Sequence, residues 1–131
     1  MSGPFIFIAT NRLKPGRLEI ERKRVAELSA FIEANEPRLL SFNEYVDDAG
    51  SEVAVVQVHP DIGSMVFHMK LVRERAAQAY AETLDATTGI QIYGTPSEAF
   101  LWGLRQATGE GATVSIKPEH LGGFIRKIEP S

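Results

Sequence analysis

Two of the three histidines in this chain of 131 residues lie nine positions apart, at His59 and His68, in the stretch VHPDIGSMVFHMK. An imidazole has an unperturbed pKa near 6.5, so a histidine that faces a pocket can exchange a proton with a ligand near neutral pH. Metal binding is the competing interpretation. A catalytic zinc, however, takes three protein ligands, and the nearest third candidate, Asp61, lies where the chain must turn. We therefore predict acid–base chemistry and no metal.

His68 is the stronger candidate of the two histidines. It follows Met65 by three positions and precedes Val72 by four, so on a helix it lies at the edge of an apolar stripe. Its side chain would then face the interior or the rim of a pocket. There it could act as a base, or it could be a structural histidine bound to a backbone carbonyl, and the sequence leaves both interpretations open.

Amides and a phenol interrupt otherwise apolar strand patterns. Asn43 and Tyr45 are two positions apart and share one face of a predicted strand, and Gln57 and His59 share a face of the next. An unpaired buried polar group costs about 1–3 kcal/mol, so each of these side chains needs a hydrogen-bond partner. They could pair across a hairpin or meet a ligand. Packing is the simpler explanation for each one taken singly.

Apolar, charged and turn residues alternate along the chain in a pattern that predicts the elements around these positions. The predicted order is a strand at 5–10, a helix at 17–35, strands at 39–46 and 52–59, a helix from an N-cap at Ser64 to about Leu84, and a strand at 88–93. This is the βαββαβ order of the ferredoxin-like α+β fold, an antiparallel sheet with two helices on one face. We expect Glu21, near the start of the first helix, to reach solvent.

Residues 95–131 form a C-terminal extension of this unit. A helix ending at Thr108 and a short strand at 113–117 are predicted there. The sequence has no low-complexity segment or linker, so we treat 1–131 as a single domain.

The predicted sheet is apolar on the face that the two helices leave bare. In the first strand one alternating set contains Phe5 and Phe7, and the other contains Ile6 and Ile8. An exposed face of this kind is an association surface. Packing two copies face to face about a twofold axis would bury it, so we expect a homodimer. The alternative is that the C-terminal extension covers the face within one chain.

Composition excludes several classes of function. The net charge of −3 and the isoelectric point near 5.6 argue against a nucleic-acid partner, which would need clustered positive charge. Cysteine is absent, which excludes a thiolate nucleophile and a zinc–sulfur site. The apolar run at residues 4–9 is too short for a membrane span and lacks the cationic start of a signal peptide. We expect a cytoplasmic protein without a membrane partner.

Two stretches, FIFIATNRLKPG at 5–16 and QVHPDIGSMVFH at 57–68, together with the element order, resemble the antibiotic-biosynthesis-monooxygenase-like family of the dimeric α/β-barrel superfamily. The resemblance covers roughly residues 4–94. It implies that two subunits join their sheets into a barrel and that each has a pocket between its sheet and helices or inside the barrel. Members include oxygenases without cofactor or metal that act on quinols, haem-degrading enzymes, and proteins with no known reaction, so fold alone does not settle function.

The resemblance also assigns individual positions. Asn11 lies where haem-degrading relatives have a catalytic asparagine, and His59 lies where many relatives have a tryptophan. His68 matches a helix position that relatives often fill with His or Trp. Haem-degrading relatives need a further, axial histidine along that helix, where this chain has Gln78, Ala79 and Tyr80. This difference argues against a haem cofactor.

If the protein is an enzyme, the sequence favours a monooxygenase without a cofactor that oxidises a small aromatic, quinol-type molecule. His68 or His59 would take the substrate proton, and the resulting carbanion would pass an electron to O₂. The candidates are His68, His59 and Asn11 for catalysis, and Asn43, Tyr45, Gln57, Met65 and Phe67 for substrate binding. The alternatives are a non-catalytic small-molecule-binding or assembly protein of the same fold and a haem-binding or haem-degrading monooxygenase.

Overall fold

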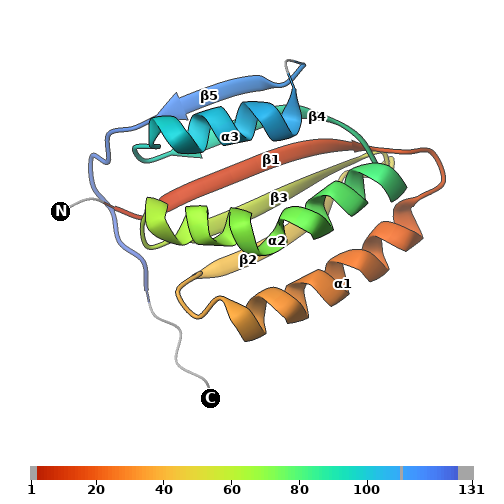
Figure 1. Ribbon diagram of the computed structural model, residues 1–131, viewed down its shortest axis with the longest axis horizontal. Coiled ribbons are helices and arrows are strands. Elements are labelled where there is room, and N and C mark those ends of the chain that lie inside the picture. The colour runs from red at the N-terminus through yellow and green to blue at the C-terminus, as the bar shows by residue number, and fades with distance from the viewer. Residues whose placement is uncertain (1–2, 110, 127–131) are drawn as a thin grey trace.

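The computed structural model describes residues 3–109 and 111–126, and its helices all lie on one face of a single sheet (Figure 1). The elements are β1 (Phe5–Leu13), α1 (Leu18–Asn35), β2 (Ser41–Val46), β3 (Glu52–His59), α2 (Ile62–Glu82), β4 (Leu84–Tyr93), α3 (Glu98–Thr108) and β5 (Thr113–Lys117). None of these helices combines the length and the hydrophobicity that crossing a membrane requires.

The sheet has the strand order β2-β3-β1-β4-β5. The central strand β1 pairs antiparallel with β3 and β4, and β2 and β3 form a hairpin. The predicted ferredoxin-like α+β fold is therefore confirmed. The C-terminal extension adds β5 parallel to β4, because α3 carries the chain back across the helix-covered side, so the complete sheet is mixed.

Several predicted boundaries were wrong by a few residues, and three of the differences have a local reason. β1 continues to Leu13 and β4 starts at Leu84 because these two residues pair with each other beyond the apolar runs that the pattern detects. Helix α2 begins before Ser64, and its N-cap is Asp61, whose carboxylate accepts the backbone N–H of Ser64 at 2.9 Å.

The main core lies between the sheet and α2 and α3. It is built from a set of buried apolar side chains: Phe5, Phe7, Met65, Ile90, Ile92, Phe100 and Leu104. Phe100 of α3 packs edge-on against Phe5 and Phe7, with ring centroids 5.7 and 6.0 Å apart. Helix α3 thus belongs to the core and closes the part of the sheet that α1 and α2 do not cover.

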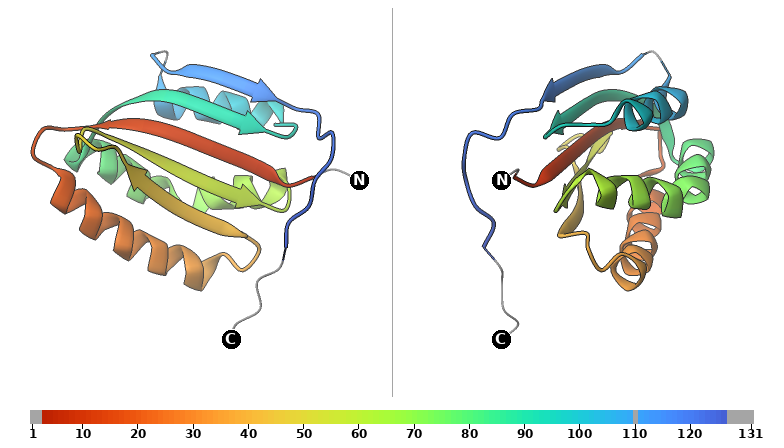
Figure 2. Two further views of the ribbon diagram at one scale, coloured as in Figure 1. Left: turned by 180° about the vertical axis from the view of Figure 1, so that it is seen from behind. Right: turned by 60° about the vertical axis from the view of Figure 1, so that its left-hand side comes forward.

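The other face of the sheet is bare among the described residues. Ile6 and Ile8 of β1 and Val56 and Val58 of β3 point to this face, and each is partly exposed. The C-terminal segment after β5 runs past the strand ends instead of crossing the face (Figure 2). The described part of the extension therefore does not cover the face within one chain.

Candidate functional site

The sheet divides the predicted site residues between its two faces. Gln57 and His59 face the helices, where His68 of α2 also lies. Asn43 and Tyr45 of β2 pair with Val56 and Ala54, residues of the bare face, so they too point away from the helices. Tyr45 is 63% exposed there. The structure therefore groups the histidines with Gln57 and separates them from the two candidates on β2.

His59 is fully buried, and both of its ring nitrogens have partners. Nε2 lies 2.9 Å from Gln57 Oε1, and Nδ1 lies 2.7 Å from Ser64 Oγ. An amide oxygen can only accept, so Nε2–H donates to Gln57 and Nδ1 accepts from the Ser64 hydroxyl. Burial, helped by the neighbouring His68, lowers the pKa of His59 to about 4. His59 therefore stays neutral at pH 7 and fastens the end of β3 to the first turn of α2.

His68 forms the second half of this arrangement with a residue that the sequence analysis did not identify. Its Nδ1 lies 2.7 Å from Oε2 of Glu36, and both residues are buried. Burial lowers the pKa of His68 to about 4 and raises the pKa of Glu36 to about 7. Below pH 7 the carboxyl group therefore donates its proton to Nδ1, and above pH 7 the Nδ1–H of the neutral ring donates to the carboxylate.

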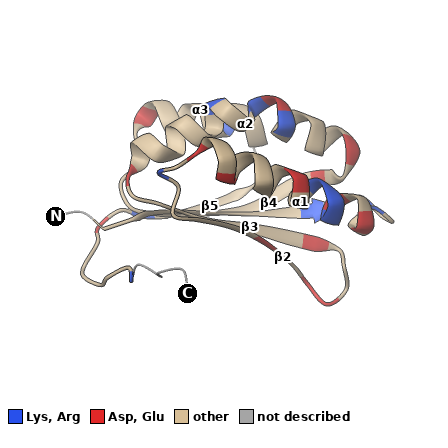
Figure 3. Ribbon diagram, turned by 90° about the horizontal axis from the view of Figure 1, so that it is seen from below, with Lys and Arg blue, Asp and Glu red and all other residues tan. Residues whose placement is uncertain are grey.

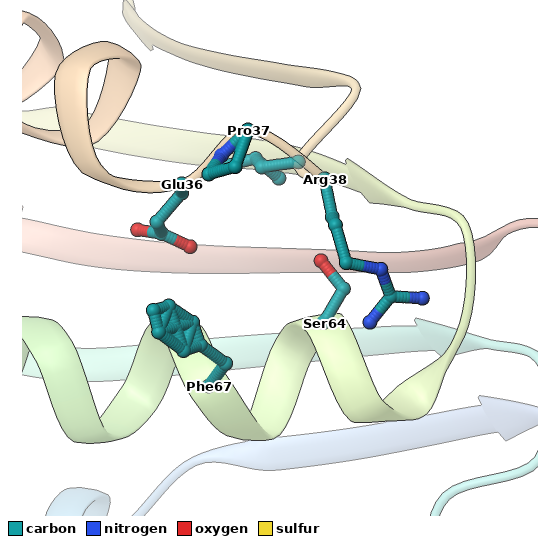
Figure 4. A pocket seen from close by; sticks show the side chains of 6 residues that line it. Glu36, Pro37, Arg38, Ser64 and Phe67 are labelled. Carbon is teal, nitrogen blue, oxygen red and sulfur yellow. The ribbon is translucent and has the colours of Figure 1, made fainter.

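Glu36 Oε1 is the one buried side-chain nitrogen or oxygen without a hydrogen-bond partner among the described residues. The residue lines a pocket of about 380 Å³ between the α1–β2 loop and α2. The lining residues are Glu36, Pro37, Arg38, Leu39, Ser64 and Phe67. The carboxyl group of Glu36 points toward α2, whose Phe67 and Ser64 side chains face the same space (Figure 4). An unpaired buried oxygen beside a pocket is ready to accept a ligand's hydrogen bond.

The end of α1 explains why Glu36 turns inward. The helix finishes at Asn35, the backbone N–H of Glu36 still binds Ile32 O at 2.8 Å, and Pro37 prevents another helical turn. The chain then bends toward β2 and carries the carboxyl group over α2. No local pattern reveals this contact, because a glutamate before a proline is usually exposed and its partner lies 32 positions away.

Asn11 lies in a different polar group. Its Oδ1 accepts the Thr87 hydroxyl at 2.6 Å and the Tyr80 hydroxyl at 3.3 Å. Asn11 is six positions along β1 from Phe5, the residue that pairs with His59, so it is far from the pocket. Among the remaining candidates, Met65 is a core residue, whereas Phe67 is 47% exposed and lines the pocket.

A third polar group contains Glu21, whose predicted exposure was wrong. Its side chain accepts two hydrogen bonds from Arg24, at 2.7 and 2.6 Å, and one from Thr83 at 2.7 Å, and the residue is 1% exposed. Burial opposes ionisation of Glu21, but the hydrogen bonds from Arg24, Glu44 and Thr83 outweigh it and lower its pKa. Burial and the Glu21 charge raise the pKa of Glu44 to about 9. Glu44 therefore holds a proton at neutral pH.

No three His, Asp or Glu side chains lie together in residues 3–109 and 111–126 in a way that could hold a metal ion.

Comparison with known proteins identifies the fold. The sequence matches no protein-family model and shows no significant match to a curated protein. In solved structures, the chain is similar to MupZ from Pseudomonas fluorescens, with a TM-score of 0.67, 13% identity, and coverage of 94% of this chain and 91% of that chain. A structure described as an antibiotic biosynthesis monooxygenase has a TM-score of 0.59 and 18% identity, covering 71% of this chain and 99% of that chain.

A third structure, PA3566 from Pseudomonas aeruginosa, has a TM-score of 0.59 and 20% identity, and covers 70% of this chain and 93% of that chain. The chain thus has the fold of the antibiotic-biosynthesis-monooxygenase-like proteins, as its resemblance implied. At these identities the likeness establishes the fold. The match to MupZ must extend beyond β4, because the residues up to Tyr93 make up less than three quarters of the chain.

Proposed function

We propose that the protein is a monooxygenase without a cofactor, in which Glu36, positioned by His68, removes a proton from a small phenolic or quinol-type substrate. The observation that carries this proposal is the buried contact of 2.7 Å between these residues, which leaves Glu36 Oε1 unpaired beside a pocket. A pocket of about 380 Å³ lies at the small end of the range for ligand sites. Its apolar wall, with Phe67 and Leu39, suits an aromatic ring.

In this proposal Glu36 accepts the proton and His68 positions Glu36. The Nδ1–H of His68 donates to Oε2, which fixes the carboxylate and leaves Oε1 to receive a hydrogen bond from the substrate hydroxyl. Burial raises the pKa of Glu36 to about 7, which matches the base to neutral pH. Gln57, His59 and Ser64 act one step further away, because their hydrogen bonds hold the start of α2 in place.

The oxidation then needs only O₂ as a co-reactant. The deprotonated substrate passes one electron to O₂, giving a substrate radical and superoxide, and these join at a ring carbon ortho or para to the oxygen. Glu36 returns its proton to the peroxide anion, and the resulting hydroperoxide loses water and leaves a carbonyl group at that carbon. Overall, one C–H carbon of the phenol becomes C=O, one atom of O₂ enters the product, and the other leaves as water.

The bare sheet face leads to the associated proposal of a homodimer. Ile6, Ile8, Val56 and Val58 are partly exposed on it, and Asn43 and Tyr45 would lie at the edge of the interface. A second sheet packed on this face, at the usual separation of about 10 Å between sheets, would bury these apolar groups. This assigns Asn43 and Tyr45 to dimerisation.

The test is oxygen uptake by the purified protein with a panel of mono- and dihydroxyaromatic compounds. With an active compound, Glu36→Gln should lower turnover by about 100-fold or more, the usual contribution of a general base. His68→Gln should also lower turnover, whereas Glu33→Gln and Glu74→Gln, at exposed positions of α1 and α2, should not. Wild-type turnover should rise with pH through about 7 as Glu36 ionises. Absence of uptake across the panel, or equal uptake by Glu36→Gln and the controls, would falsify the proposal.

A further inference from the structure

We propose that residues 118–126, here called the C-terminal arm, pack against the partner subunit of the homodimer and hold the two sheets together at their rim. This inference rests on the homodimer of the proposed function, although it is independent of the proposed reaction. The proposed contact adds to the packing of the two sheets, because the arm lies outside the unit formed by β1 to β4.

The beginning of the arm is fixed to its own chain. The Thr95 hydroxyl donates to Pro118 O at 3.3 Å just after β5. The ring of His120 then lies directly on Gly3, where an added Cβ would clash with His120 Cδ2. The path of the arm past the start of β1 therefore depends on a residue without a side chain at position 3.

Beyond His120 the arm exposes large apolar side chains. Leu121 is 91% exposed, Phe124 is 80% exposed and Ile125 is 51% exposed. Single exposed apolar residues are common on proteins, but three within five positions on a projecting segment mark an interaction surface. The guanidinium group of Arg126 lies over the Phe124 ring at 5.2 Å, which leaves most of that ring open.

The position of the arm indicates its partner. The arm passes to the side of the sheet opposite the helices (Figure 3), and it runs beside the strand ends without lying on its own sheet (Figure 2). The same side carries the apolar face that includes Ile8 and Val56. A second sheet packed there would lie about 10 Å below the first, on the side to which the arm passes (Figure 3). A second copy of this chain therefore meets both apolar surfaces at once.

Sedimentation of the full chain over a dilution series tests the inference. The double variant Leu121→Ser and Phe124→Ser should raise the dissociation constant of the dimer by about tenfold or more. The control variant Ile20→Ser removes an apolar side chain that is 44% exposed on α1 and should leave that constant unchanged. Equal dissociation constants for the two variants would overturn the arm contact while leaving the dimer intact. A wild-type chain that is monomeric throughout the series would overturn both, whatever its oxygen uptake.

A second measurement uses the absence of cysteine from the sequence. Phe124→Cys can be labelled at that position alone with an environment-sensitive fluorophore. The emission should shift to the blue at concentrations where the dimer forms and return on dilution. An emission maximum that stays the same across the transition would contradict burial of the arm on the partner subunit.

Discussion

Two buried carboxylates under the helices differ in how completely they are paired. Glu21 receives hydrogen bonds on both oxygens, from Arg24 and Thr83. Glu36 receives one from His68 on Oε2, and its Oε1 has no partner within the described residues. Burial is nearly the same, at 1% and 5% exposure. A buried charged residue is thus a poor guide to function by itself, whereas a buried residue with an unused hydrogen-bonding atom beside a pocket is a good one.

The partners of the two carboxylates explain this difference. Arg24 is always charged, so Glu21 is held as a carboxylate in an ion pair, and Glu21 also ties α1 to the end of α2 through Thr83. His68 is neutral at pH 7 because burial lowers its pKa to about 4, so Glu36 has no fixed positive partner. The pKa of Glu36 rises to about 7 for this reason, since burial is not compensated. The Glu21 group is suited to stability and the Glu36 group to proton transfer.

The largest effect is expected from Glu21→Ala. It leaves the charge of Arg24, whose side chain is 17% exposed, without its main partner, and breaking a buried pair costs about 3–5 kcal/mol of unfolding free energy. Glu19→Ala is the matched control, because Glu19 and Arg22 form a pair at 3.4 Å with the same spacing on the same helix, but with exposed side chains. The control should cost less than about 1 kcal/mol. Urea denaturation measures the two losses of unfolding free energy. Equal losses for Glu21→Ala and Glu19→Ala would show that the buried pair stabilises the fold no more than the exposed pair does.

Glu36→Gln should change stability in the opposite direction. The folded-state pKa of about 7 lies above the ordinary value of 4.5, so the stability associated with the neutral carboxyl group is present below pH 4.5 and is lost as pH rises through 7. A glutamine cannot ionise and avoids this loss. We expect the variant to exceed the wild type by up to about 3 kcal/mol at pH 8 and to show no such gain at pH 4.5. Denaturation midpoints at the two pH values measure this difference. A variant that is less stable at pH 8 would mean that the Glu36 carboxylate is well solvated.

The sequence predicted the fold better than it predicted this contrast between Glu21 and Glu36. Period-two and helical patterns report which face a residue occupies, so the order of elements and the inward position of His68 could be recognised. Hydrogen-bond partners distant in sequence could not be predicted. Glu36 meets His68 only because Pro37 bends the chain after α1, and Glu21 is buried only because Thr83 reaches it from the end of α2. Both carboxylates therefore look like ordinary surface residues in the sequence.

The smallest effect on the free energy of unfolding is expected from the ion pair at the edge of the pocket. Arg38 and Asp61 form an ion pair whose side chains are 57% and 50% exposed. Water screens such a pair, so Arg38→Ala should cost less than about 1 kcal/mol. Asp61→Ala should lower the free energy of unfolding by roughly 1 kcal/mol more than Arg38→Ala does. The reason is that the Asp61 carboxylate also caps α2 by accepting the backbone N–H of Ser64. Because Ser64 also binds His59, loss of the cap should lower turnover more than loss of Arg38 does. Equal effects of the two variants on unfolding and turnover would show that the cap does not position the pocket.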